Sequence, residues 1–497
     1  MKKKFKEKIR NLVNPGKNLS DKVAKGAFWI FLLRIFTRSF SLLKSLILAR
    51  LLSPKDFGLF GIALLTFSIL ENLSNTGFNN ALIQKKGGIK NYLDSAWTVQ
   101  ILRETVIANV IFWFSPYISI FFNEPGATNI LRALALGILI KGFVNIGVIN
   151  FQKDLEFNKN FIYELSAVFT DVIFSISMAL ILKNVWALVI GYILGNVVRV
   201  VVSFIISETT PKISFDIQKV SELFSFGKWI LASNVLVYIL TQGDDILVGR
   251  LLGATSLGVY QMAYKFSNLP ATEWSHLVAK LTYPAYSKLQ NNVKKMKKVY
   301  MYSLKMTAFL SFPVSGAIFI FADPFTKLIL GEKWLSIIPI MKILSVYGLL
   351  RSIGATTGVI FMALGKPEIR TRFQLFQVFI FGILIYPGIE KFGLHGASYI
   401  VTFYSIFNYF MVYLIYRILN LDIKEVLKAN IIPLSFTIIT MLTINFLKIN
   451  YFNMTSYFNF IFLILISITI YVSLVVIFDK KLNYNIKSLI INQLKKL

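Results

Sequence analysis

The chain has 497 residues, of which 56% are hydrophobic, and its mean hydropathy of +0.64 excludes an ordinary soluble domain. It contains no cysteine, which excludes disulfides, thiol catalysis and cysteine-ligated metal. The net charge of +29 can be balanced by anionic lipid headgroups and requires no nucleic acid. Because apolar runs long enough to cross a bilayer recur from end to end, the sequence predicts an all-α integral membrane protein.

The apolar runs predict about 14 membrane-spanning helices. They are expected at residues 27–49, 57–76, 96–122, 129–150, 161–182, 185–207, 227–248, 257–283, 299–322, 335–363, 375–389, 394–416, 431–447 and 457–478. The basic segment that precedes them lacks a short apolar core with a cleavage site, so it is expected to stay as a cytoplasmic segment. The segments on that side hold about four times as many Lys and Arg residues as the alternate loops, which predicts that both termini lie in the cytoplasm.

The first expected span carries an unusual set of basic residues. Its sequence WIFLLRIFTRSFSLLKSLILAR, residues 29–50, contains Arg34, Arg38 and Lys44. A cation inside the bilayer costs about 2.5–3.5 kcal/mol on insertion scales, so such residues mark ligand or ion pathways. Since cations outnumber acids within the expected spans, the pattern predicts a transporter for an anionic substrate.

The chain also contains an internal repeat. A shift of two hundred residues aligns 29–30 with 229–230, and 50–52 with 250–252, without a gap. A parallel repeat predicts two pseudo-symmetric six-helix lobes around a central cavity, with two additional C-terminal helices. The expected parts are the basic N-terminal segment 1–26, the N-terminal lobe 27–207, a cytoplasmic linker 208–226, the C-terminal lobe 227–418, helices 13 and 14 at 419–478, and a basic cytoplasmic tail 479–497.

The aligned first and seventh spans present matching polar faces. Positions four residues apart share one side of a helix, and the face of Arg34 and Arg38 corresponds to that of Asn234, Tyr238 and Asp245. Lys44 aligns with Asp244. These two residues would either form a salt bridge between the lobes that acts as a gate, or extend separately to the outer interface.

Further charges lie on other spans. Lys265 and Lys280 share a polar stripe of the eighth span with His276, and Glu273 lies beside it. His276 would act either as a proton relay or as a neutral partner of Glu273. Charges on the third and fifth spans are expected to pair with neighbouring helices; they are Arg103, Glu104, Glu164 and Asp171.

Several segments resemble one known family. LARLLSPKDFGLFGIA at 48–63, after Lys25-Gly26, resembles the start of bacterial polysaccharide-repeat (O-antigen or exopolysaccharide, Wzx-like) flippases of the multidrug/oligosaccharidyl-lipid/polysaccharide exporter superfamily. QGDDILVGRLLGATSLGVYQMAYK at 242–265 is similar to that family's seventh and eighth spans. ILGEKW at 329–334 and ALGKPEIRTR at 363–372 are similar to its loops before and after span ten.

The resemblance implies that an undecaprenyl-pyrophosphate-linked oligosaccharide is flipped to the outer leaflet by alternating access. Arg34 and Arg38 would hold the pyrophosphate, because a guanidinium matches phosphate oxygens. The second-tier cations are Lys265, Lys280 and Arg103, the sugar-contact candidates are Asn234, Tyr238 and Gln242, and the gate or coupling candidates are Lys44, Asp244, Asp245, Glu273 and His276. No cofactor or metal is expected, whereas a proton or sodium gradient and a polysaccharide polymerase are expected partners.

Three other functions remain open. A drug exporter of the same superfamily would use acids such as Asp244, Asp245 and Glu273, although the surplus of cations disfavours it. A flippase for the peptidoglycan precursor would share the architecture. A membrane glycosyltransferase or polymerase would need carboxylates or a metal on a sizeable loop, and the expected external loops are short. The chain is therefore expected not to be an enzyme.

Overall fold

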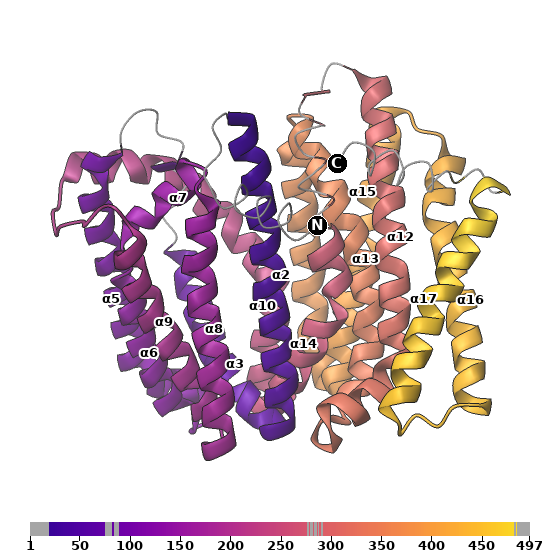
Figure 1. Ribbon diagram of the computed structural model, residues 1–497, viewed down its shortest axis with the longest axis horizontal. Coiled ribbons are helices and arrows are strands. Elements are labelled where there is room, and N and C mark those ends of the chain that lie inside the picture. Colours follow the sequence, from indigo (N-terminus) through magenta and orange to yellow (C-terminus); the bar gives the residue numbers. More distant parts are fainter. Residues whose placement is uncertain are drawn as a thin grey trace, which may run out of the picture. The chain divides into compact units, whose positions relative to one another are not determined.

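The computed structural model describes residues 19–74, 82–83, 89–275, 278, 282, 286, 288–289, 292–481 and 484, with the backbone alone for 19–21, 23–24, 90–91, 217–235, 274, 367 and 480–481. Within these residues the secondary structure is helical and contains no strand (Figure 1). The chain divides into two compact units, Met1–Tyr238 with Gly253–Thr255 (unit 1) and Ile239–Leu252 with Ser256–Leu497 (unit 2).

The helices of the first half are α2 (Leu19–Leu51), α3 (Pro54–Leu73), α5 (Lys90–Phe121), α6 (Ala127–Gly142), η1 (Ile146–Val148), α7 (Ile149–Lys153), α8 (Phe157–Leu182) and α9 (Trp186–Ile206). Those of the second half are α10 (Ile217–Ser267), η2 (Pro270–Ser275), α12 (Val293–Phe325), η3 (Thr326–Leu330), η4 (Glu332–Trp334), α13 (Ile337–Ala363), α14 (Pro367–Ile406), α15 (Asn408–Leu419), α16 (Ile423–Asn450) and α17 (Tyr457–Lys481).

Ten helices in the described part of the chain are long and apolar enough to cross a membrane, or eleven when the bent pair Ala127–Gly142 and Ile146–Lys153 counts as one. Two of them, α10 and α14, each contain one predicted span and the beginning of the next. Together with α2, they account for the fourteen expected spans, and the predicted fold class is confirmed. The protein is a multi-pass membrane protein.

Glycines in the left-handed region divide α10 and α14. Gly253 has φ 79° and Gly393 has φ 56°, a conformation that residues with a Cβ adopt at a cost. Gly253 corresponds in the repeat to Ser53, where α2 gives way to α3. There the turn is stabilised differently, because the Ser53 side chain and Asp56 form a capping box at the start of α3. Both halves therefore turn at the same position of the repeat.

The fourth expected span differs from the prediction of one continuous helix. It is broken after Gly142 and bent by 66°. Asn145 stabilises the break, because its side chain accepts a hydrogen bond from Gly147 N (2.8 Å) and donates one to Thr209 O (2.6 Å). Hydropathy did not reveal the bend, since both arms are apolar.

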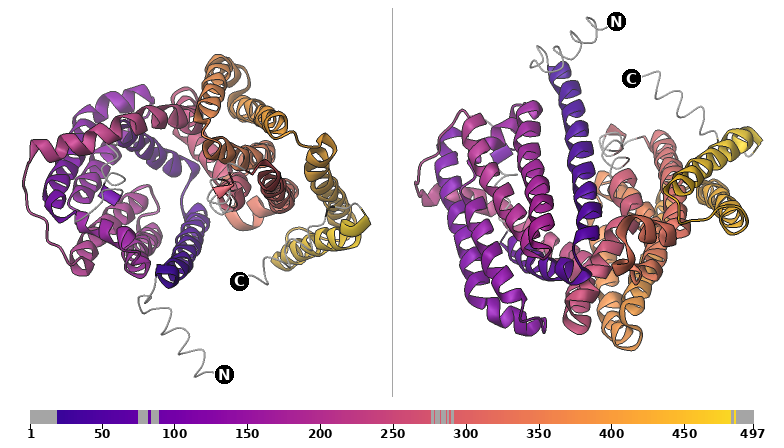
Figure 2. Two further views of the ribbon diagram at one scale, coloured as in Figure 1. Left: turned by 90° about the horizontal axis from the view of Figure 1, so that it is seen from above. Right: turned by 60° about the horizontal axis from the view of Figure 1, so that its bottom comes forward.

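Within unit 1, α8 packs against α2 and α9, and α5 packs against α6. Within unit 2, α13 packs against α12, α14 and α15, while α16 packs against α12 and α17. Figure 2 shows α16 and α17 side by side at the C-terminal end of the fold. Small residues permit close approach between helices in lipid. A Cβ on Gly191 of α9 would lie 1.9 Å from Ser175 Oγ of α8.

Replacing Gly396 should destabilise the α14 hairpin. A Cβ built at this position would lie 1.8 Å from the backbone oxygen of Gly388 on the other arm. Overpacking of this kind costs roughly 1–3 kcal/mol, so we expect Gly396→Ala to lower the thermal unfolding temperature in detergent.

The matched control is Gly382→Ala in the same helix, where a Cβ would meet no atom within 4 Å. It should leave the unfolding temperature unchanged or slightly raised, since alanine favours a helix. Equal unfolding temperatures for the two variants would show that the hairpin arms are not in close contact at Gly396.

Candidate functional site

Ion pairs compensate most of the charges inside the helices of unit 1. They connect Lys44 of α2 with Asp171 of α8 (2.6 Å), Glu71 of α3 with Lys141 of α6 (2.5 Å), and Glu164 of α8 with Arg199 of α9 (3.2 Å). The predicted pairing of Glu164 and Asp171 with charges on neighbouring helices is thereby confirmed. The expectation of neighbouring-helix partners was wrong for Arg103 and Glu104, which pair with each other on α5.

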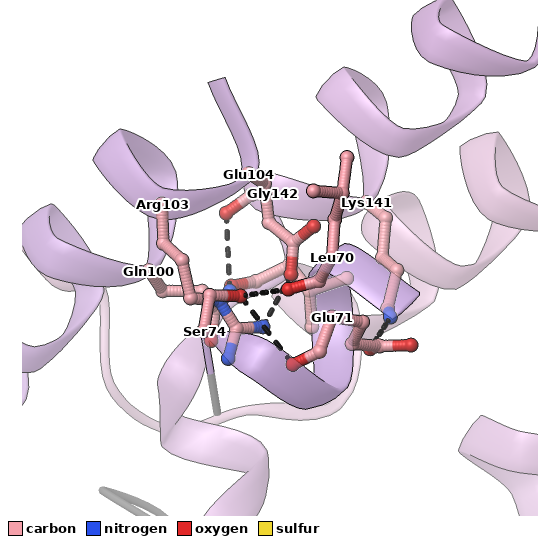
Figure 3. A network of polar contacts seen from close by, with 9 residues as sticks. Leu70, Glu71, Ser74, Gln100, Arg103, Glu104, Lys141 and Gly142 are labelled. Atoms are coloured by element: carbon pink, nitrogen blue, oxygen red, sulfur yellow. Dashed lines mark hydrogen bonds and ion pairs between the residues drawn. The ribbon is translucent and has the colours of Figure 1, made fainter. Parts of the chain in front are cut away.

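A polar network connects α3, α5 and α6 at the end of α6 (Figure 3). Gln100 Nε2 donates to the carbonyls of Gly142 (3.0 Å) and Val144 (2.9 Å). These carbonyls lie where α6 ends, so the amide replaces hydrogen bonds that a continuous helix would supply. The adjacent pairs Arg103–Glu104 and Glu71–Lys141 contribute two positive and two negative charges. Because the network is neutral, we expect it to hold the three helices together rather than attract an anion.

Arg34 and Arg38 lie one turn apart on α2 and are partly exposed. The aromatic residues of α2 that contact α8 are Trp29, Phe36 and Phe40. At 3.6 residues per turn, the two arginines point to roughly the opposite side of α2 from these rings. They therefore form a basic face that is not directed at α8.

Lys44 and Asp244, the predicted gate, each have a partner inside their own unit. Asp171 Oδ1 accepts from Lys44 Nζ and also from Ser175 Oγ (3.2 Å). Asp244 is 2% exposed and accepts from the hydroxyl of Tyr260 (2.7 Å). A Lys44–Asp244 gate stays a prediction that would require both residues to exchange partners.

The predicted sugar and coupling residues are placed only in part. Tyr238 shares a hydrogen bond with the Ser68 hydroxyl (2.9 Å) and donates to the Leu65 carbonyl (3.2 Å), so its hydroxyl is bonded to α3. Gln242, Asp245, Lys265 and Glu273 are partly buried on α10 and η2. The side chain of Asn234, and all of His276 and Lys280, lie outside the described residues.

Arg351, at the middle of α13, was not assigned a role from the sequence. Its Nη1 donates to the hydroxyl of Tyr264 on α10 (2.5 Å), and its guanidinium lies 5.7 Å from the ring centroid of Tyr347. One sequence signal could have pointed to this residue. Tyr347 precedes Arg351 by one helical turn, and Tyr260 precedes Tyr264 by the same interval, which places aromatic residues on shared faces.

An apolar cavity of about 370 Å³ lies between α12, α16 and α17 in unit 2. Aliphatic and aromatic side chains line most of it, and they include Phe309, Pro313, Met441, Ile464 and Tyr471. Such a lining suits a hydrocarbon chain. Among the described residues, no group of three or more His, Asp or Glu side chains could hold a metal ion.

Comparisons with known proteins agree with this architecture. A family model described as "Polysaccharide biosynthesis protein" matches residues 47–339. The lipopolysaccharide biosynthesis protein WzxC of Escherichia coli (strain K12) is 26% identical over 80% of this chain and 81% of its own length. The lipid II flippase MurJ in an inward closed conformation has a similar fold, with TM-score 0.70 and 18% identity over 92% of this chain and 99% of MurJ. An inward-facing multidrug resistance MATE family transporter has TM-score 0.63 and 17% identity over 77% of this chain and 94% of its own.

Exchanging the charges of Lys44 and Asp171 tests their pairing. Lys44→Asp or Asp171→Lys alone would place two like charges together inside the helices, and we expect each to lower the unfolding temperature in detergent. The double exchange should restore much of the loss, because it re-forms the pair in reverse.

Lys44→Asp combined with Asp244→Lys is the matched comparison. It should restore nothing, since Asp171 would still face a carboxylate. Restoration by the Asp244 exchange, with none by the Asp171 exchange, would favour the gate pair instead.

Proposed function

Because the chain belongs to the polysaccharide biosynthesis protein family, we propose that it flips an undecaprenyl-pyrophosphate-linked oligosaccharide from the cytoplasmic to the outer leaflet of a bacterial plasma membrane. The observation that carries this proposal is the basic face of Arg34 and Arg38 on α2. A pyrophosphate cannot cross hydrocarbon without replacement of its water shell, and two guanidinium groups one turn apart can donate several charge-assisted hydrogen bonds to it.

The two ends of such a substrate need different surroundings. The glycan and pyrophosphate require a polar path, whereas the polyprenyl chain is stable only against apolar groups. The cavity between α12, α16 and α17 offers an apolar surface of that kind within unit 2. We propose that this cavity receives part of the polyprenyl chain.

Net transport by alternating access needs a source of energy, or a later reaction that removes the flipped glycan from the outer leaflet. The sequence contains no GxxxxGK[ST] nucleotide-binding motif, so we propose a transporter rather than an ATP-hydrolysing enzyme. The adjacent acids Asp244 and Asp245 are the proposed site for a coupling proton or sodium ion. With both termini in the cytoplasm, the flipped glycan would be delivered to a polysaccharide polymerase at the outer face.

The test is translocation of an undecaprenyl-pyrophosphate oligosaccharide across proteoliposomes that contain the purified protein. The wild type should expose the glycan on the opposite leaflet. The Arg34→Gln, Arg38→Gln variant should lose this activity while remaining folded in the membrane, since it lacks both guanidinium groups.

The matched control is the Arg370→Gln, Arg372→Gln variant, which removes two arginines from the start of α14, outside the predicted spans. It should translocate like the wild type. Full activity in the Arg34/Arg38 variant would refute the binding site. An inactive but folded wild type, with several glycans and both ion gradients, would refute the function.

A further inference from the structure

Arg351 lies far from both ends of its helix. It is the fifteenth of the 27 residues of α13, so roughly 20 Å of helix separates it from either end at 1.5 Å per residue. Basic side chains near the end of a transmembrane helix can extend to the interface, but this position is too deep for that. Its charge must therefore be stabilised inside unit 2.

No carboxylate forms an ion pair with Arg351 in the described part of the chain. Among the described residues, no carboxylate oxygen lies within 4 Å of the Arg351 guanidinium. The other basic residues of α12 and α13 differ, because Lys342 is paired with Asp323 (2.6 Å) and Lys305 donates to the carbonyl of Tyr484 (3.2 Å). The buried acid Asp244 accepts its hydrogen bond from Tyr260. The Arg351 guanidinium is thus hydrogen-bonded to a neutral hydroxyl and forms no ion pair among the described residues.

Tyrosine side chains hold the guanidinium in one orientation. The Tyr264 hydroxyl accepts from Arg351 Nη1, and its oxygen lies 2.8 Å from that of Tyr347. The ring of Tyr347 contacts that of Tyr404, whose hydroxyl donates to the Leu240 carbonyl (3.1 Å). Tyr347 and Tyr404 are 2% and 5% exposed, so this assembly is packed and preorganised.

The remaining donors of Arg351 make no hydrogen bond to another described residue. The side chain is partly exposed, and none of its nitrogens is buried without a hydrogen-bond partner. A guanidinium carries five N–H groups, and Tyr264 uses only the one on Nη1. An oriented cation with unused donors and no carboxylate partner can bind an oxygen anion by a forked pair of charge-assisted hydrogen bonds.

We propose that Arg351, held by Tyr264 and Tyr347, is a substrate-binding residue of unit 2 that binds an oxyanion of the transported lipid-linked glycan. This inference rests on the proposed function. The oxyanion belongs either to the diphosphate linker or to the carboxylate of an acidic sugar, and both present oxygens that match the guanidinium.

Equilibrium binding to the full-length protein in nanodiscs tests the proposal with three probes: undecaprenyl diphosphate without sugar, a soluble oligosaccharide of uronic acids, and a neutral oligosaccharide of similar length. Loss of one charge-assisted contact corresponds to about tenfold weaker binding or more. Arg351→Gln should show this loss for one of the two anionic probes and none for the neutral one. Which anionic probe is affected identifies the source of the oxyanion.

Two further variants keep the test decisive if Arg351→Gln is unstable. Arg351→Lys keeps the charge without the fork, and Tyr264→Phe keeps the ring without the acceptor that orients the guanidinium. Both should weaken binding of the same probe, by less than Arg351→Gln, and Arg351→Gln should reduce the salt dependence of its affinity. The controls are Arg370→Gln and Tyr409→Phe, which should bind like the wild type.

Unchanged affinity for both anionic probes in folded Arg351→Gln would overturn the proposal. So would unchanged affinity in both Arg351→Lys and Tyr264→Phe when Arg351→Gln does not fold. If the wild type translocates its glycan and the Arg351 variants bind normally, only this inference fails. If the wild type neither binds a probe nor translocates a glycan, the proposed function fails with it.

Discussion

Charge compensation inside the helices is the constraint on which the rest of this structure depends. Hydrocarbon cannot solvate a lysine or a carboxylate, so each charge needs a nearby partner, which a neighbouring helix supplies in most of these pairs. The pairs Lys44–Asp171 and Glu164–Arg199 join α8 to α2 and α9. A side chain at Gly191 would collide with Ser175 beside Asp171. Charge pairing and small-residue packing therefore specify the same helix arrangement.

The central arginine of unit 2 satisfies this constraint by a different chemistry from the ion pairs of unit 1. In unit 1 the pairs are cation with carboxylate, so the paired positions carry little net charge. In unit 2 the central arginine is surrounded by tyrosines, whose hydroxyls and ring faces stabilise a cation without neutralising it. Asp244, nearby in sequence to Tyr260, is likewise bonded to a hydroxyl. A charged group that is bonded to a neutral partner keeps its net charge, whereas an ion pair is neutral as a whole.

Sequence patterns predicted the helices far better than their partners. The lengths of the apolar runs located the fourteen spans. The repeat predicted that α10 turns at the position that corresponds to the junction of α2 and α3. The bend after Gly142 was missed because a side chain, Asn145, replaces the missing backbone bonds without interrupting the apolar run. Arg103 was expected to reach another helix and instead pairs with Glu104. Periodicity shows which face a residue occupies, but the partner depends on packing that a single sequence does not encode locally.

The repeat shows how duplicated helices can acquire complementary chemistry. The turn persists at positions 53 and 253, although a capping box forms the first and a left-handed glycine the second. The same turn can therefore be stabilised by different residues in the two halves. The side chains have diverged in charge, since Arg34 and Arg38 correspond to Asn234 and Tyr238, and Lys44 to Asp244. A duplicated hairpin supplies two copies of one helix arrangement, and the side chains of each copy can change without loss of that arrangement.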